Sequence, residues 1–351
     1  MFFQFAHAQE SESLYRIKAA AHYGFIIAHT TGMANLIKSH VPAFEVNFEL
    51  PTTGKKEWER IYSNPTWGFS WYFTDFENPE ETGVATGIYP FMNFPIIKKE
   101  KFILQYRLGW GLGYVSKRFD RIKNHKNIVI GSHINAIIGM HLEAEARLSE
   151  RLFAHAGIAL THFSNGAYKM PNLGFNIATS GAGFSYQIGS SEKSDQAGER
   201  PVYKKSKYLN LVGAGGIKEI YPSGGRKYGA CSFSLEGVKT LSEKSHLAGS
   251  LDMFYNSSLV ARLSTDSTSV SHLAVTQLGF SISYRAVISR IRVIVSNGIY
   301  IYSLYSKDGN LYHRIGMRYA INDRISANIS LKTHFFRADY IETGLCYTLI
   351  K

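Results

Sequence analysis

Residues 133–148 read His-Ile-Asn-Ala-Ile-Ile-Gly-Met-His-Leu-Glu-Ala-Glu-Ala-Arg-Leu, and this stretch decides the fold class. Successive side chains of a β-strand point to opposite faces, so one face carries Ile, Ala, Met and Leu while the other carries His, Asn, Glu and Arg. The stretch is longer than the roughly 9–11 residues that a tilted strand needs to cross a bilayer. An apolar face opposite a charged one is typical of a transmembrane β-barrel, whose apolar side meets lipid.

The same alternation recurs along the whole chain. Between residues 101 and 116 large apolar residues face one way, whereas Gln105, Arg107 and three glycines face the other. We interpret Glu143, Glu145 and Arg147 as an ion-pair network in a narrow lumen, in preference to a pair of catalytic carboxylates. The predicted strands form two sets of eight: about 15–31, 42–50, 66–75, 83–96, 101–116, 128–149, 151–165 and 173–189, then 208–221, 226–241, 245–263, 271–288, 290–304, 310–321, 324–338 and 340–350.

The two sets indicate a tandem repeat. Residues 151–163, Arg-Leu-Phe-Ala-His-Ala-Gly-Ile-Ala-Leu-Thr-His-Phe, resemble residues 324–335, Arg-Ile-Ser-Ala-Asn-Ile-Ser-Leu-Lys-Thr-His-Phe. We therefore predict an all-β fold, a transmembrane antiparallel β-barrel protein with two tandem eight-stranded repeats. One merged 16-stranded barrel is the alternative. The predicted organisation is a leader remnant (1–14), a first barrel with the site (15–189), a polar linker (190–207) and a second, degenerate repeat (208–351).

Composition narrows the class of protein further. Of the 351 residues 45% are apolar and 19% charged, and no run approaches the roughly 20 apolar residues of a spanning helix. Ala6-His7-Ala8 matches the end of a signal peptide, so we expect the true start upstream of Met1. The net charge of +12 indicates an anionic partner. Without a basic helix or zinc-type spacing we expect no nucleic acid, and we predict neither a metal nor another cofactor.

The candidate catalytic residues lie in Thr161-His-Phe-Ser-Asn-Gly166 and in the following segment Pro171-Asn-Leu-Gly-Phe-Asn176. His162 and Ser164 lie two residues apart in a predicted strand and continue its apolar parity. On a lipid-facing wall such a pair would act on a molecule that lies in the bilayer. In the second repeat the alternation puts His334 in the lumen, so we expect a candidate site in the first repeat only.

This segment, residues 161–176, resembles the PagL family of outer-membrane lipid A 3-O-deacylases, also described as acyloxyacyl hydrolases. The resemblance implies an eight-stranded barrel in the bacterial outer membrane with a lipid-facing Ser–His–acid triad. Its partner would be lipid A, or lipopolysaccharide, in the outer leaflet, from which the family removes the ester-linked acyl chain at position 3. Carried over by residue, Ser164 is the nucleophile, His162 the base and Asn165 a donor to the oxyanion.

The third member of the triad departs from the family pattern. The family has a glutamate twelve residues after the serine, and here that position is Asn176. In serine proteases an amide in place of the acid costs about 10⁴ in rate, although papain-like enzymes use Cys–His–Asn. The outer-membrane phospholipase A family uses Ser–His–Asn. Because an unpaired amide on a lipid-facing wall would cost several kcal/mol, we predict a working triad of Ser164, His162 and Asn176.

A basic loop is predicted on the same side of the membrane as the end of strand 151–165. Lys117, Arg118 and Arg121, followed by Lys123 and Lys126, would meet the phosphates of lipid A. Two other functions stay open at this point. One is a non-enzymatic outer-membrane barrel with a decayed site, and the other is an esterase that acts on glycerophospholipids.

Overall fold

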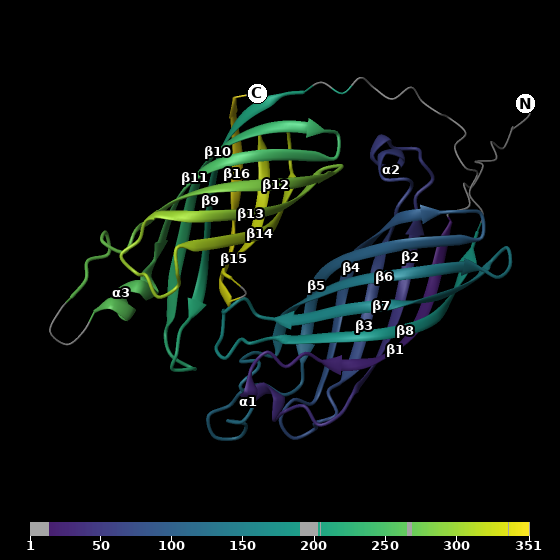
Figure 1. Ribbon diagram of the computed structural model, residues 1–351, viewed down its shortest axis with the longest axis horizontal. Coiled ribbons are helices and arrows are strands. Elements are labelled where there is room, and N and C mark those ends of the chain that lie inside the picture. Colours follow the sequence, from purple (N-terminus) through teal and green to yellow (C-terminus); the bar gives the residue numbers. More distant parts are fainter. Residues whose placement is uncertain (1–13, 190–202, 204, 265–268, 336, 351) are drawn as a thin grey trace, which may run out of the picture. The chain divides into compact units, whose positions relative to one another are not determined.

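The computed structural model describes residues 14–189, 203, 205–264, 269–335 and 337–350. These residues form antiparallel strands with three short helices (Figure 1). The first eight strands are β1 (Tyr15–Ile26), β2 (Val41–Pro51), β3 (Thr66–Asp75), β4 (Val84–Lys98), β5 (Phe102–Val115), β6 (Ile134–Arg147), β7 (Leu152–Ser164) and β8 (Phe175–Ile188). The second eight are β9 (Lys207–Glu219), β10 (Lys227–Ser242), β11 (Ser245–Asn256), β12 (Gln277–Ile288), β13 (Ile291–Tyr302), β14 (Leu311–Ala320), β15 (Ile325–His334) and β16 (Arg337–Ile350). The helices are α1 (Thr31–Ala34), α2 (Glu57–Ile61) and α3 (Ser257–Leu263).

Each set of eight strands closes on itself. β1 pairs with β8, and β9 pairs with β16, so the strands form two separate sheets, each a closed barrel. The prediction of two eight-stranded antiparallel barrels is confirmed, and the merged 16-stranded alternative is wrong. Most of the predicted linker, 190–207, and all but one residue of the predicted leader remnant, 1–14, lie outside the described residues.

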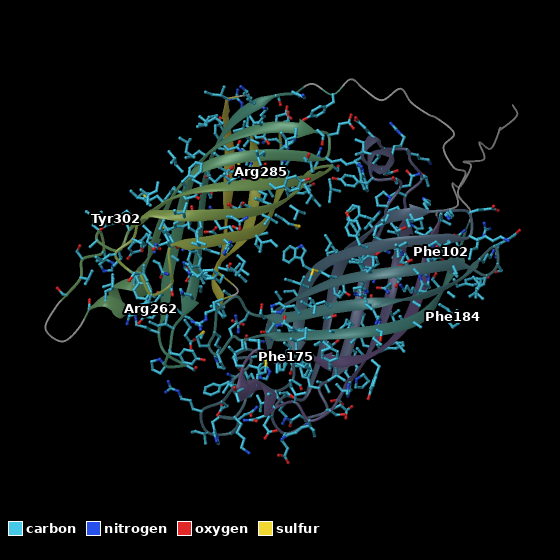
Figure 2. All side chains as sticks on the ribbon, viewed as in Figure 1. Phe102, Phe175, Phe184, Arg262, Arg285 and Tyr302 are labelled. Carbon is cyan, nitrogen blue, oxygen red and sulfur yellow. The ribbon has the colours of Figure 1, made fainter. Side chains whose placement is uncertain are left out.

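The alternation of side chains follows the predicted faces. On β6 the side chain of Ile134 is 63% exposed, whereas Glu143 and Glu145 are buried. Figure 2 shows Phe102 and Phe184 on the outer wall of the first barrel, and both are exposed. The apolar side chains therefore face outward, where lipid would be, and the charged ones face the lumen.

Ion pairs fill the lumen of the first barrel. Arg107 pairs with Glu45 and, at 3.2 Å, with Glu49. Such a network satisfies charges that would otherwise be costly to bury.

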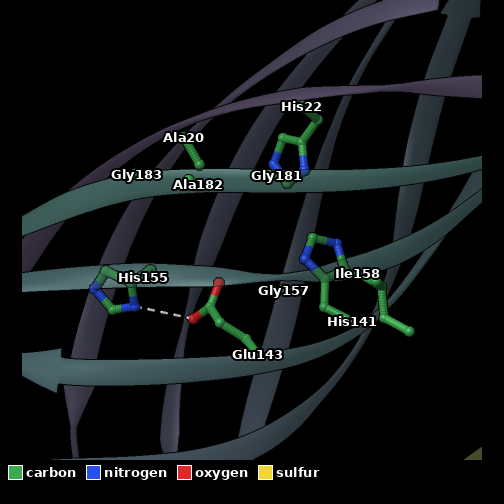
Figure 3. Close-up of a pocket in the computed structure, with 10 residues that line it drawn as sticks. All are labelled: Ala20, His22, His141, Glu143, His155, Gly157, Ile158, Gly181, Ala182 and Gly183. Carbon is green, nitrogen blue, oxygen red and sulfur yellow. Dashed lines mark hydrogen bonds and ion pairs between the residues drawn. The ribbon is translucent and has the colours of Figure 1, made fainter.

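A second part of this network surrounds Glu143. Lys18 pairs with Glu143, whose Oε1 lies 3.1 Å from Nδ1 of His155 (Figure 3). Glu143 thus belongs to the lumen network, as predicted. Arg147 does not, because its side chain is exposed and its Nε donates to the carbonyl of Ser149.

The loops identify the two ends of each barrel. In the second barrel β10 and β11 are joined by two residues, as are β12 and β13, whereas residues 257–276 separate β11 from β12. In the first barrel residues 116–133 and 165–174 are long loops at one end. At the other end 99–101 and 148–151 are short connections, and only 52–65, which carries α2, is long. Outer-membrane barrels have short periplasmic turns and longer extracellular loops. β7 therefore runs toward the extracellular end.

Some predicted strands are shorter than expected. The predicted strand 245–263 ends at Asn256, because the Asn256 side chain accepts a hydrogen bond from the backbone N–H of Ser258 and caps α3. The predicted strand 128–149 begins only at Ile134. None of the helices in the described part of the chain is long and apolar enough to span a membrane.

Candidate active site

Two neighbouring strands carry the predicted catalytic residues on the outer wall of the first barrel. On β7 the side chain of Phe163 is buried in the lumen, so His162 and Ser164 take the outward parity. On β8 the side chain of Ile177 is buried, and Asn176 therefore also points outward. All three outward residues are half-buried. They lie at the extracellular ends of their strands.

A hydrogen bond joins two of these residues across the strands. Nδ1 of His162 lies 2.7 Å from Oδ1 of Asn176. An amide oxygen only accepts hydrogen bonds, so Nδ1 carries the proton and Nε2 is left as an acceptor. A neutral imidazole with a free Nε2 is what a general base needs.

Ser164 lies next along the same strand. Among the described residues no hydrogen bond joins Oγ of Ser164 to His162. Catalytic hydrogen bonds are often loose in structures without substrate and tighten in the complex. The structure therefore brings His162 and Asn176 into contact and leaves Ser164 beside them on the same wall.

Asn165 anchors the loop that follows Ser164. Its side-chain amide donates to Oγ of Ser132 at 2.8 Å and to the carbonyl of Lys169 at 2.9 Å. Its backbone N–H donates to Oδ1 of Asn172 at 2.8 Å. The carbonyl of Asn165 also accepts from the N–H of Tyr168, which closes a tight turn. This turn fixes the backbone directly after Ser164.

Asn172 and Ser132 are the residues that sequence reasoning missed. Because Oδ1 of Asn172 accepts from Asn165, the amide nitrogen of Asn172 must point away from that contact. Among the described residues this nitrogen has no hydrogen-bond acceptor. Asn172 lies in the Pro-Asn-x-Gly segment that drew attention in the sequence, whereas nothing in the sequence pointed to Ser132.

The basic residues lie in the loop between β5 and β6. Asp120 shapes its tip, since its carboxylate accepts from the backbone N–H groups of Ile122 and Lys123. These two backbone hydrogen bonds lower the pKa of Asp120. Four of the five cations are exposed and Arg118 is half-buried, the full set being Lys117, Arg118, Arg121, Lys123 and Lys126. The loop thus presents positive charge to solvent.

The same loop meets the loop that follows Ser164. The carbonyl of Val129 accepts from the N–H groups of Leu173 and Gly174, and Ile130 forms a β-bridge with Asn172. The backbone of the β5–β6 loop therefore supports the β7–β8 loop. Among the described residues no hydrogen bond joins any of the five cations to Ser164.

Comparisons with known families match both barrels. The profile described as lipid A 3-O-deacylase (PagL) matches residues 43–186. The profile described as the C-terminal domain of acyloxyacyl hydrolase matches residues 207–351. Together they cover most of the chain. No match is found among curated proteins.

Solved structures with similar features are outer-membrane barrels of low identity. Salmonella typhi OmpF in complex with daunomycin is 9% identical, with 96% of this chain and 97% of that chain covered and a TM-score of 0.19. Outer membrane phospholipase A from Escherichia coli is 6% identical, with 94% and 92% covered and a TM-score of 0.17. At these TM-scores the likeness carries no argument about the site.

Proposed function

The chain belongs to the PagL family of lipid A 3-O-deacylases, and from this premise we propose that it cleaves an acyl ester of lipid A with Ser164, His162 and Asn176. Membership of the family supports deacylation of lipid A in the bacterial outer membrane as its activity. The observation that supports the triad is the hydrogen bond of 2.7 Å between His162 and Asn176. Polar side chains on an apolar, lipid-facing wall cost free energy, so a hydrogen-bonded pair there favours a functional role.

In the proposed reaction Oγ of Ser164 attacks the carbonyl carbon of the 3-O-linked ester and gives its proton to Nε2 of His162. The tetrahedral intermediate then expels the sugar oxygen, which takes that proton. Water cleaves the acyl-enzyme by the same two steps and releases a fatty acid. Asn176 holds Nδ1–H of His162 throughout, so that Nε2 always faces the reacting atoms.

Asn165 is the proposed donor to the oxyanion, as its place directly after Ser164 suggests. Both hydrogens of its amide are already donated within the loop, to Ser132 and to Lys169. One of these contacts would have to be exchanged for the oxyanion. The amide nitrogen of Asn172, which has no acceptor among the described residues, is a second candidate that needs no exchange. Separate Asn165→Ala and Asn172→Ala variants would show which loss of kcat is larger.

The basic loop is proposed to bind the phosphates of lipid A through Lys117, Arg118 and Arg121. Long extracellular loops lie beside the lipopolysaccharide headgroup, and cations near a charged membrane surface attract anionic groups. A variant with the five loop cations replaced by Gln should bind lipid A more weakly. Unchanged activity at lipid A concentrations below saturation would remove this assignment.

One assay separates the proposed function from its rivals. Purified wild type and Ser164→Ala are incubated with lipid A and, separately, with glycerophospholipid, and the released fatty acid is measured by mass spectrometry. Release from lipid A that depends on Ser164 supports the proposal. Release from phospholipid alone would support the glycerophospholipid esterase. No release from either lipid would support a barrel with a decayed site.

A further inference from the structure

The second barrel carries a polar pair on its own outer wall. Nδ1 of His313 on β14 lies 2.7 Å from Oδ1 of Asn297 on β13. The two residues are direct cross-strand partners. The next outward side chains along these strands, Ile299 and Ile315, are both more than half exposed. The pair therefore lies among apolar side chains that face lipid.

A hydroxyl stands on the other side of this histidine. Thr333 on β15 is the direct cross-strand partner of His313, so three neighbouring strands present Asn297, His313 and Thr333 in one row. Residues directly opposite in an antiparallel pair have Cα atoms about 4.5–5.5 Å apart. The register of β15 against β16 shifts between Lys332 and Thr333, and such bulges often re-aim a side chain.

The row lies at the same end of its barrel as the first site does. His313 is two residues from the start of β14 and Thr333 is one residue from the end of β15, both at the end with the long loops. The ring of Phe335 meets the ring of His313 edge-on, with centroids 6.1 Å apart. This contact limits the rotation of the imidazole and covers it with an apolar group.

The hydrogen bond between His313 and Asn297 does not explain why all three residues of the row are polar. The hydrogen bond with Asn297 occupies Nδ1 of His313 and leaves Nε2 as an acceptor. Within the described part of the chain the hydroxyl of Thr333 has no hydrogen-bond partner. A purely structural position on a lipid-facing wall would cost less free energy with apolar residues at all three places.

We propose that Thr333, His313 and Asn297 form a second esterase site, on the lipid-facing wall of the second barrel, which acts on acyl esters of outer-leaflet lipids. Oγ1 of Thr333 attacks the carbonyl carbon and His313 takes its proton at Nε2. The proton then passes to the leaving alcohol oxygen as the C–O bond breaks. Water hydrolyses the acyl-threonine and releases a fatty acid. The site shares with the first barrel the premise of a lipid ester as substrate, but it does not need Ser164.

The first test is covalent labelling with a fluorophosphonate, which reacts with hydroxyls that a neighbouring base activates. Full-length Ser164→Ala is labelled in detergent micelles, and the modified peptide is identified by mass spectrometry. We expect a phosphonate on Thr333 that is lost in Ser164→Ala/His313→Gln. Labelling of Ser164 in the wild type reports on the first site separately, so failure of one proposal is distinguishable from failure of the other.

The second test measures turnover of lipid A and of glycerophospholipid by the same variants. We expect Ser164→Ala to keep a slow release of fatty acid from one of them, which falls at least tenfold in Ser164→Ala/Thr333→Val. Thr333→Ser should restore it. Thr343 on β16 is another outward threonine, so Ser164→Ala/Thr343→Val is the matched control and should resemble Ser164→Ala. Correct folding of every variant is checked by the heat-dependent shift of a barrel on a gel.

Two results would overturn the second site. One is the absence of phosphonate on Thr333 in a folded Ser164→Ala protein that releases no acid above the buffer blank. The other is labelling or release that persists in Ser164→Ala/Thr333→Val, which would place the reactive hydroxyl elsewhere.

Discussion

The two barrels hold a histidine in the same way and differ in where they place a hydroxyl beside it. In each barrel Nδ1 of a lipid-facing histidine lies 2.7 Å from an asparagine oxygen on the neighbouring strand. In the first barrel Ser164 lies two residues further along the strand of His162, about 6.7 Å at the rise of a strand. In the second barrel Thr333 lies opposite His313 on the adjacent strand. The same contact between histidine and amide thus occurs with the hydroxyl on the strand of the histidine or on the adjacent strand.

The second site cannot be found by aligning the two repeats, because it lies on other strands and at other positions. Aligned by their arginines, residues 162 and 164 correspond to Phe335 and Arg337, so the second repeat has lost the first site. His334, which the sequence match pairs with His162, points into the lumen, where its Nε2 lies 2.8 Å from the hydroxyl of Tyr300. The row in the second barrel uses other strands and other positions.

Removal of the first nucleophile should give the largest effect. We expect Ser164→Ala to lower the rate of lipid A deacylation by roughly 10³-fold, because the acyl-enzyme can no longer form there. Thr333→Val in the wild-type background should lower it less than twofold. Fatty acid release measured by mass spectrometry decides between them. An equal loss of activity in the two variants would contradict the prediction that the first barrel carries most of the activity.

Loss of a lumen cation should destabilise one barrel at a time. Arg107→Leu leaves Glu45 and Glu49 without their cation, and breaking a buried pair in this way costs about 3–5 kcal/mol. Since each barrel pairs its own first and last strands, we expect an unfolding transition in urea for the first barrel to move while that of the second stays. Arg147→Leu, an exposed cation on β6, is the control and should shift neither transition measurably.

The mirror-image experiment is Arg314→Leu in the second barrel. Arg314 pairs with Glu342 and with Asp252 in that lumen. The transition of the second barrel should then move alone. A single transition that moves in both variants would mean that the two barrels unfold as one unit.

The orienting amide should matter less than the nucleophile. Asn176→Ala is expected to lower kcat on lipid A about 10²-fold, because Nδ1 of His162 loses its acceptor. Asn176→Glu should instead raise kcat roughly tenfold, since a charged acceptor forms a hydrogen bond about twice as strong with the imidazolium. Asn297→Ala removes the matching amide of the second barrel and, like Thr333→Val, should lower the rate on lipid A less than twofold. A kcat that Asn176→Ala leaves unchanged would contradict the triad.

The sequence predicted the fold from alternation alone, and it predicted which face each site residue takes. On β7 the side chain of Phe163 points inward, and those of His162 and Ser164 point outward. Outward residues of a membrane barrel can reach only a substrate that lies in the bilayer. The sequence could not predict contacts that depend on register between strands. His313 lies opposite Asn297, 16 positions before it in the sequence, and opposite Thr333, 20 positions after it. These neighbours depend on the register in which the three strands pair. Likewise the loop contact of Ser132 with Asn165 depends on two loops meeting in space.

The smallest expected effect concerns the basic loop. Replacement of Lys117, Arg118, Arg121, Lys123 and Lys126 by Gln should raise KM for lipid A roughly tenfold at low salt and leave kcat unchanged, because the loop lies outside the proposed triad. Added salt should shrink the difference, since exposed charges are screened beyond about 10 Å at 0.1 M ionic strength. Lys205→Gln/Lys207→Gln removes two exposed cations at the end of the second barrel that has the two-residue turns, and it is the control for net charge. A rise of KM in the control that is as large per charge removed would mean that net charge attracts the lipid and that the loop itself recognises nothing.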